Sequence, residues 1–239
     1  MIEFRSVDDD APVLVYSPLV RAVEKTLAYI EAHGGIGLTP AGAFKRVFVH
    51  WAAAQFEWPG YGEAELFAYN KVLNEYDFGP LEDIHGALIA LKIGRHYKKQ
   101  FRLTRAGRTL VSHPGRLFGI VTPFYLFEVD HLRFARTQEQ LLGSWDIFLN
   151  VLNVEAENGA SGRAIRNALY GEHPQEDLLG SILNNLYVQV LRPLCWAGLL
   201  HEDRVNLMRS EESVFTKTPL WHAALQLATD RHVSPATRH

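Results

Sequence analysis

The chain of 239 residues contains one cysteine, Cys195, which excludes a disulfide framework and any Cys-rich zinc module. No apolar run approaches the ~20 residues of a membrane span. The start, Met1-Ile-Glu-Phe-Arg5, lacks the charged and apolar regions of a signal peptide. Lys and Arg number 24 against 27 Asp and Glu, a net charge of -3, so nucleic-acid contact would need a local basic patch. We therefore expect a cytoplasmic protein with no membrane partner.

The sequence also lacks short catalytic motifs, such as a Gly-rich phosphate loop, His-Glu-x-x-His, Gly-x-Ser-x-Gly and Cys-x-x-Cys. Its eleven histidines are scattered. Asp130 and His131 are adjacent and point apart on a helix, and Cys195 lies in an apolar stretch without a cation to lower its pKa. Glu82 and Asp83 suit a helix N-terminus. Paired carboxylates or metal-ligand spacing for a hydrolase or nuclease are missing. We expect a non-enzyme with no cofactor or metal.

Helix start and stop signals recur along the first half of the chain. Ser17-Pro18 and Thr39-Pro40 each join an N-cap residue to a proline, and Gly34-Gly35 ends the first helical pattern. After Gly94 the pattern becomes polar and then strand-like. The predicted helices cover residues 18–33, 40–54, 64–74, 81–93 and 104–111, with strand-like segments at 13–16 and 101–104.

The second half repeats this order. Phe215-x-x-Thr218 echoes Phe101-x-x-Thr104, each after a helix that ends in glycine. The predicted helices cover residues 141–154, 162–170, 178–197 and a last one from Thr218-Pro219, with strands at 199–200 and 213–215. Helix, helix, short β-ribbon, helix is the order of a winged helix-turn-helix unit.

The predicted fold class is mainly α with short β-ribbons (α+β), arranged as tandem winged-helix-like units. A single α-rich domain without duplication is the alternative. The expected domains are residues 1–135, with an aromatic loop, and residues 136–229, followed by a mobile tail over 230–239.

A cationic segment over residues 95–108 contains no acid. Its cations are Arg95, Lys98, Lys99, Arg102, Arg105 and Arg108. They form either a solvated face or a wing that contacts phosphates, as in a DNA-binding transcriptional regulator. The predicted helix over 81–93 offers no Asn, Gln or Arg to read base edges.

An aromatic loop over residues 55–67 either packs on the core or serves as a peptide ligand with rigid anchors. Two registers resemble the bacterial sliding-clamp-binding peptide, whose consensus is Gln-Leu-Ser/Asp-Leu-Phe. One register uses Glu63, Leu66 and Phe67, with Glu63 in place of the consensus Gln. The other uses Gln55, Phe56 and Trp58, with Pro59 in place of the last Phe.

Three segments of the first unit resemble a group of uncharacterised bacterial winged-helix-like proteins. They are Gly34-Gly-Ile-Gly-Leu-Thr-Pro-Ala-Gly42, Phe101-Arg-Leu-Thr-Arg-Ala-Gly107 and His113-Pro-Gly-Arg-Leu-Phe118. With the chain length and the clamp-like loop, the sequence is also similar to the SocB family of replication-inhibiting toxins. That resemblance implies binding to the DNA polymerase III β sliding clamp, an antitoxin partner and disposal by a ClpXP-type protease.

A clamp ligand must be accessible to its partner. We therefore predict that at least one of the pairs Phe56/Trp58 and Leu66/Phe67 is substantially exposed. A structure that buries these side chains would require local unfolding before clamp binding, and would favour the DNA-binding interpretation.

Overall fold

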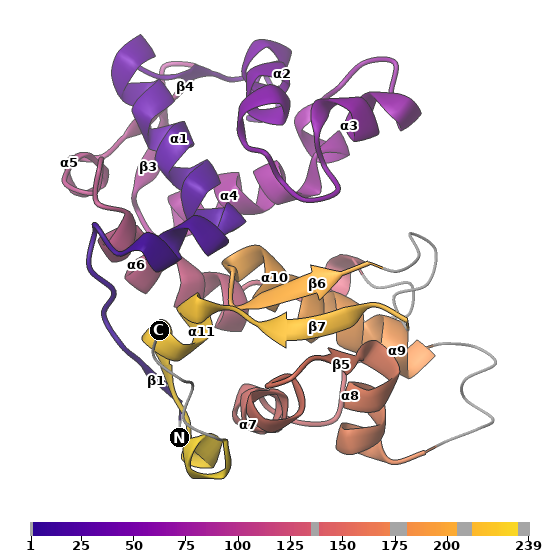
Figure 1. Cartoon of the computed structure of the whole chain (residues 1–239). Coiled ribbons are helices and arrows are strands. Elements are labelled where there is room, and N and C mark those ends of the chain that lie inside the picture. The colour runs from indigo at the N-terminus through magenta and orange to yellow at the C-terminus, as the bar shows by residue number, and fades with distance from the viewer. Residues whose placement is uncertain (1, 135–138, 173–180, 205–211, 234–239) are drawn as a thin grey trace. The chain divides into compact units, whose positions relative to one another are not determined.

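The structure, a computed structural model, describes residues 2–134, 139–172, 181–204 and 212–233. The chain divides into two compact units (Figure 1). The N-terminal unit is Ser6–Tyr125, and the C-terminal unit joins Met1–Arg5 to Leu126–His239, whereas the sequence places the boundary after residue 135. Both units are mostly helical with short antiparallel strands, which confirms the α+β class. Among the described helices, none has the length and apolar character needed to cross a bilayer.

The N-terminal unit surrounds a three-stranded antiparallel sheet of order β2-β4-β3. Its helices are α1 (Pro18–His33), α2 (Arg46–Gln55), α3 (Glu63–Tyr69), α4 (Gly79–Ala90), α5 (Arg105–Arg108) and α6 (Pro114–Phe127), with 3-10 turns at Pro12–Tyr16 and Glu75–Asp77. Its strands are β2 (Ile36–Gly37), β3 (Gly94–Tyr97) and β4 (Gln100–Leu103).

The C-terminal unit has a sheet of the same kind, of order β5-β7-β6, and a second pair, β1-β8. Its helices are α7 (Trp145–Glu155), α8 (Gly162–Tyr170), α9 (Ser181–Leu186), a π-helical turn (Tyr187–Leu191), α10 (Arg192–Ala197) and α11 (Pro219–Ala224), with 3-10 turns at His131–Phe134 and Ala228–His232. Its strands are β1 (Glu3–Phe4), β5 (Ala160–Ser161), β6 (Leu200–Asp203), β7 (Val214–Lys217) and β8 (Leu225–Gln226).

A buried phenylalanine holds the same register position in both three-stranded sheets. Phe101 on β4 pairs with Ile36 on one side and His96 on the other. Phe215 on β7 pairs with Ala160 and Glu202 in the same way. Both phenylalanines are fully buried, so each sheet is built around one aromatic anchor. The Phe echo in the sequence therefore marks equivalent positions of a structural repeat.

A threonine closes each of these sheets against the preceding helix. The N–H of Thr104 donates to the Ile93 carbonyl (2.9 Å), and the N–H of Thr218 donates to the Leu199 carbonyl (3.0 Å). Each hydroxyl also donates to a carbonyl at the end of that helix. Side-chain hydrogen bonds of this kind satisfy carbonyls that the helix end leaves open.

The predicted start of the first helix is confirmed, because Ser17 Oγ accepts from the N–H of Val20 at 3.2 Å. The second predicted start is wrong. Thr39 exchanges hydrogen bonds with Ala43 through both its backbone and its hydroxyl, and Gly42 has a φ of 87°, so this segment is a closed turn. Side chains of Thr compete in this way with helical bonding. Helix α2 begins only at Arg46.

Two further predictions, near the two ends of the chain, are wrong. Residues 13–16 belong to a 3-10 turn and not to a strand, since Pro12 fixes φ and supplies no N–H for a ladder. Asp230 is not part of a loose tail, because its carboxylate accepts from Asn153 Nδ2 (2.8 Å) and from the Leu227 N–H (3.0 Å). Arg231 and His232 belong to the same 3-10 turn as Asp230, and residues 234–239 of the predicted tail lie outside the described residues.

A pair of glycine substitutions tests this packing. A Cβ at Gly107 would lie 2.0 Å from the Ile93 carbonyl oxygen, whereas a Cβ at Gly86, on the exposed side of α4, meets nothing within 4 Å. We expect Gly107→Ala to lower the free energy of unfolding by about 1–3 kcal/mol. Gly86→Ala should raise it by about 0.5–1 kcal/mol. Urea unfolding of both full-length variants checks this, and equal effects would contradict the close approach of α5.

Candidate nucleic-acid interface

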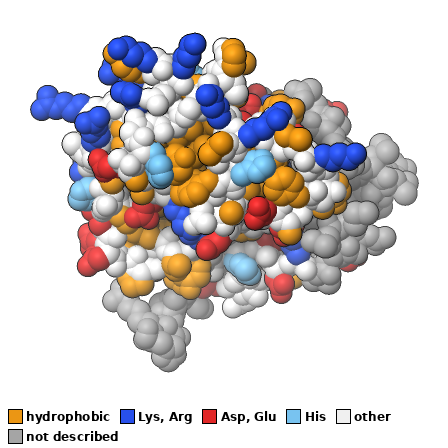
Figure 2. All heavy atoms as spheres, turned by 90° about the horizontal axis from the view of Figure 1, so that it is seen from above, with side chains coloured by type: hydrophobic (Ala, Val, Ile, Leu, Met, Phe, Trp, Pro, Cys, Tyr) orange, Lys and Arg blue, Asp and Glu red, His pale blue; other side chains and the backbone are white. Residues whose placement is uncertain are grey.

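The hairpin formed by β3 and β4 carries the cations that the sequence singles out. Arg95 pairs directly with Arg102, and Tyr97 pairs with Gln100 across the ladder. Lys98 and Lys99 form the two-residue turn between the strands. Among the cations of the hairpin, Arg95, Lys98 and Lys99 are well exposed, whereas Arg102 is half-buried. In the view from above, Lys and Arg side chains lie mostly along one half of the visible face (Figure 2).

The turn of this hairpin is occupied by residues that its backbone does not favour. Lys98 has a φ of 48° and Lys99 a φ of 62°, and two positive φ values are the signature of a type I′ turn. Asn-Gly is the preferred pair for such a turn, because side chains with a Cβ are strained there. Each left-handed lysine costs roughly 1–2 kcal/mol. Strain of this kind is more often found at functional sites than in ordinary loops.

Three cations of the hairpin lie near one aromatic ring and lack acidic partners. The charged groups of Arg95, Lys98 and Arg102 lie 5.5, 5.3 and 5.6 Å from the ring centroid of Tyr97. Within the described part of the chain, no carboxylate forms an ion pair with any of these three or with Lys99. Like charges directly opposite in a ladder repel. An anion bound beside Arg95 and Arg102 would reduce the repulsion between these two side chains.

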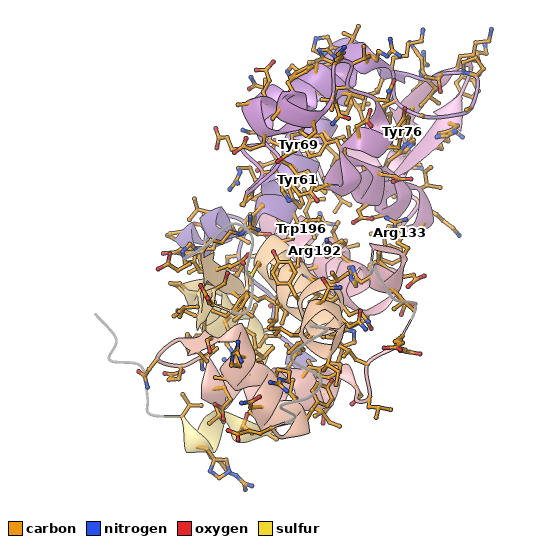
Figure 3. The ribbon with its side chains drawn as sticks, turned by 90° about the vertical axis from the view of Figure 1, so that its right-hand side faces the viewer. Tyr61, Tyr69, Tyr76, Arg133, Arg192 and Trp196 are labelled. Atoms are coloured by element: carbon orange, nitrogen blue, oxygen red, sulfur yellow. The ribbon has the colours of Figure 1, made fainter. Side chains whose placement is uncertain are left out.

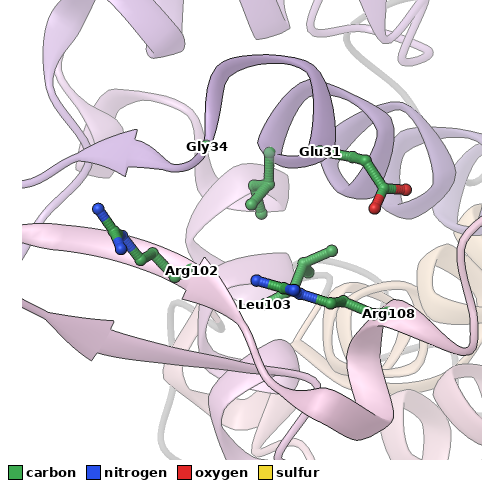
Figure 4. Close-up of a pocket in the computed structure, with 6 residues that line it drawn as sticks. Glu31, Gly34, Arg102, Leu103 and Arg108 are labelled. Atoms are coloured by element: carbon green, nitrogen blue, oxygen red, sulfur yellow. The ribbon is translucent and has the colours of Figure 1, made fainter.

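The positive charges of Arg102 and Arg108 can also be explained by their position near the end of α1. Together with Glu31, Gly34 and Leu103 they line a hollow of 180 Å³ at the end of α1 (Figure 4). Cations near a helix C-terminus complement its partial negative charge. Arg105 is exposed on α5, outside the hairpin. The strongest candidates for contact with an external anion are therefore Arg95, Lys98 and Lys99.

A basic hollow of 660 Å³ lies between the hairpin and the turn that follows β2. Lys45, His96, Lys98 and Lys99 line it. The backbone joins its two walls, because the Leu38 N–H donates to the Lys99 carbonyl at 2.9 Å. Its size falls in the range of small-ligand sites.

A chain of three side chains runs from the interior to this basic hollow. Glu75, which is buried, accepts from the Phe44 N–H and lies 2.6 Å from His85 Nδ1. His85 Nε2 lies 2.9 Å from Nε2 of His96, on the exposed side of β3. The Phe44 ring stacks on His85 at 3.8 Å. We call Glu75, His85 and His96 the histidine relay.

When both rings are neutral, the relay allows one arrangement of their protons. His85 Nδ1–H donates to the carboxylate, so its Nε2 accepts the proton that His96 Nε2 donates. His96 Nδ1 then carries a lone pair at the edge of the hollow. Burial, and then the neighbouring His85, lower the pKa of His96 below its ordinary value of 6.5, against the opposite effect of Glu75. His96 is thus neutral near pH 7.

The relay is not visible in the sequence. The histidines are scattered along the chain, and Glu75, His85 and His96 lie on a turn, a helix and a strand. The only local signal is Gly42, whose Cβ would lie 3.2 Å from Cε1 of the His96 ring. No spacing rule links these positions, and the packing of the turn, α4 and β3 brings them together.

The exposure predicted for the aromatic loop is wrong. Phe56, Trp58 and Leu66 are 0, 2 and 5 % exposed. The Phe56 ring packs against Trp51 (6.1 Å) and Phe78 (6.0 Å), which makes it part of the core. The loop therefore anchors α2 to the rest of the unit.

The remaining residues of the predicted clamp ligand are more accessible. Phe67 is half-buried, with its ring 5.3 Å from that of His50. Gln55 and Glu63 are exposed. In each register at least one apolar anchor is unavailable, since Leu66 is buried in one register and Phe56 and Trp58 in the other.

Helix α4, the expected reading helix, presents little to a DNA groove. Its exposed positions are Glu82, Gly86, Ile89 and Ala90, none of which pairs with base edges as Arg, Asn or Gln do. The equivalent helical segment of the C-terminal unit, Leu183–Ala197, has no exposed residue. Sequence-specific reading by these helices has no support in the side chains.

The equivalent hairpin of the C-terminal unit has the opposite character. His201, Glu202 and Asp203 hold the register positions of Arg95, His96 and Tyr97. Glu202 is already satisfied, by Arg204 Nε at 3.1 Å and by the Tyr187 hydroxyl at 3.1 Å. Among the described residues of these two hairpins, the cations without carboxylate partners lie in the N-terminal one.

Cys195 has the environment of an inert thiol. Burial raises its pKa well above the ordinary value, and the nearby Glu202 acts in the same direction. A thiol that resists ionisation is a poor nucleophile.

Comparison with known proteins identifies both units. Residues 15–116 match the model of the Y4jL N-terminal domain, and residues 135–219 match that of the y4jL C-terminal domain. "Uncharacterized protein y4jL" of Sinorhizobium fredii (strain NBRC 101917 / NGR234) is 38% identical over 164 residues, 67% of this chain and 74% of that protein. The chain belongs to the y4jL family. Each matched domain of this y4jL-family protein falls within one structural unit. No solved structure matches the chain.

The relay predicts a measurable titration. His96 should titrate below 6.5 by NMR, with its proton on Nε2 and its lone pair on Nδ1. Glu75→Gln removes the charge that raises the pKa of His96, so the pKa should fall further. Because the unfolded chain binds this proton more readily, His96 should favour folding fully above pH 6.5 and less as pH falls below it. A pKa at or above 6.5, or a proton on Nδ1, would contradict the relay.

Proposed function

We propose that the N-terminal unit binds the phosphate backbone of nucleic acid through the β3–β4 hairpin. The observation that carries this proposal is the Lys98-Lys99 turn, in which two lysines occupy positive φ at the tip of a hairpin without acidic partners. A phosphate would satisfy the two lysines together, and Arg95 on β3 adds positive charge to the same hairpin. Such contacts release counterions and supply the sequence-independent part of nucleic-acid affinity.

The rest of the chain agrees with a local and non-specific contact. The net charge is -3, so attraction must come from a patch and not from the protein as a whole. Phosphate contacts position a protein without reading sequence, and α4 exposes no base-reading side chain. We regard both units as winged-helix-like, with the N-terminal hairpin as the wing that touches the ligand.

The finer hypothesis of a SocB-like replication inhibitor remains a prediction from resemblance. Its contact with the β sliding clamp would need Phe56 and Trp58, or Leu66, to leave the core first. Extracting buried aromatic side chains of this size costs several kcal/mol. The antitoxin and protease partners depend on the same resemblance. The accessible hairpin makes the nucleic-acid proposal the better supported of the two.

A double substitution separates binding from stability. Lys98→Asn/Lys99→Gly installs the pair that a type I′ turn prefers, so the free energy of unfolding should rise by about 1 kcal/mol or more. The same change removes two phosphate contacts, and the slope of log K against log salt should fall in magnitude by roughly 1.5–2. Fluorescence anisotropy with labelled oligonucleotides at several salt concentrations, together with urea unfolding, measures both effects.

The matched control is Lys71→Gln/Lys92→Gln, which removes the same charge from exposed positions outside the hairpin. It should leave the salt slope unchanged. Wild-type protein that binds no oligonucleotide at low salt, or equal losses in both double variants, would overturn the proposed function.

A further inference from the structure

Two hollows flank the turn between β2 and α2, and they differ in chemistry. The basic hollow is described above. The second, of 580 Å³, presents the apolar side chains of Ala41, Ala43, Phe44 and Val47 together with Tyr76, and we call it the apolar hollow. Arg46, Asn74 and Glu75 also line it. Thr39 and Lys45 line both. An aromatic, apolar surface beside a cationic one is the combination that single-stranded nucleic acid needs, since bases stack while phosphates seek charge.

The aromatic group of the apolar hollow is available for stacking. Tyr76 is 72 % exposed, and Val47 beside it is also well exposed. The Tyr76 hydroxyl accepts from Asn74 Nδ2 at 3.1 Å, and Asn74 in turn accepts from Arg46 Nε at 3.0 Å. These bonds engage the hydroxyl at the edge of the Tyr76 ring and not the ring itself. A duplex keeps its bases stacked on one another, so this surface suits an unpaired strand.

The basic hollow contains an acceptor that can recognise a ribose. Its lysines donate only, and they suit phosphate oxygens. His96 Nδ1 is different, because with both rings of the relay neutral it carries a lone pair that can accept from an O–H or N–H donor. The ribose 2′-hydroxyl is a donor that RNA has and DNA lacks. Gly42 leaves the room beside this edge of the ring, since its Cβ would lie 3.6 Å from Nδ1.

We infer that the ligand of the N-terminal unit is single-stranded RNA, with a base on Tyr76, a phosphate at Lys45, Lys98 and Lys99, and a ribose 2′-hydroxyl that donates to His96. This inference rests on the proposed function and specifies its ligand. The hairpin supplies affinity for any nucleic-acid backbone, and the apolar hollow favours unpaired strands over duplexes. His96 favours ribose over deoxyribose.

Binding of roughly 12-nucleotide labelled oligonucleotides by the full-length protein tests the ligand class. The probes share one sequence as single-stranded RNA, its 2′-O-methyl form, single-stranded DNA and duplex DNA. We expect RNA to bind roughly three- to tenfold more tightly than single-stranded DNA, the contribution of one hydrogen bond. The 2′-O-methyl form has no O–H to donate and should bind like DNA. Duplex DNA should bind most weakly.

Variants assign each part of the contact. His96→Ala should abolish the preference for RNA over single-stranded DNA while affinity for DNA persists. Lys98→Asn/Lys99→Gly should weaken both equally. Tyr76→Ala should weaken single-stranded probes about fivefold or more and spare the duplex, whereas Tyr76→Phe keeps the stacking ring and should bind normally. Tyr69→Ala is the matched control, because Tyr69 is 92 % exposed and well separated from Tyr76 (Figure 3).

The outcomes separate the two proposals. Absence of binding to every probe overturns the proposed function. Binding with equal affinity for RNA and single-stranded DNA, with tighter binding of the duplex, or with undiminished affinity of 2′-O-methyl RNA, overturns the RNA inference alone. The 2′-O-methyl probe changes only the ligand, so its result holds even if His96→Ala perturbs folding.

Discussion

A carboxylate removed from water costs several kcal/mol unless hydrogen bonds replace those of the solvent, and Glu75 is such a group. Its oxygens accept from the Phe44 N–H on the turn before α2 and from His85 on α4. Through His85 the same requirement extends to His96 on the hairpin. One buried charge therefore fixes three segments that are distant in sequence. The walls of both hollows depend on it, since Glu75 lines one and His96 the other.

Local rules predict much of the fold because the relevant signals are local. The Ser17-Pro18 start, the left-handed Gly34 at the end of α1 and the Phe-x-x-Thr echo all follow from nearest neighbours along the chain. The same rules fail at Thr39-Pro40, where a hydrogen bond to Ala43 outweighs the helix signal. Cap residues are ambiguous in this way, since Thr caps helices and closes turns by the same hydrogen bond.

The candidate site divides along the same line. The cationic run is visible in the sequence because charge is a property of composition. The exposure of a side chain is not visible in the sequence. Phe56 and Trp58 show the difference, because their residue types suit a peptide ligand but both side chains are buried in the core. The relay is beyond local rules altogether, because Glu75, His85 and His96 meet only when a turn, a helix and a strand have packed together.

The strained turn at the hairpin tip gives a criterion for sorting the relatives of this chain. Mutation toward glycine or asparagine at Lys98 and Lys99 relieves backbone strain, so drift in a lineage that does not use the hairpin should run toward those residues. A lineage that keeps two cations at these positions keeps a less stable turn, which indicates selection for the cations. The residue pair at these two positions could thus divide the family into members that have kept an anionic ligand and members in which the unit is only a scaffold.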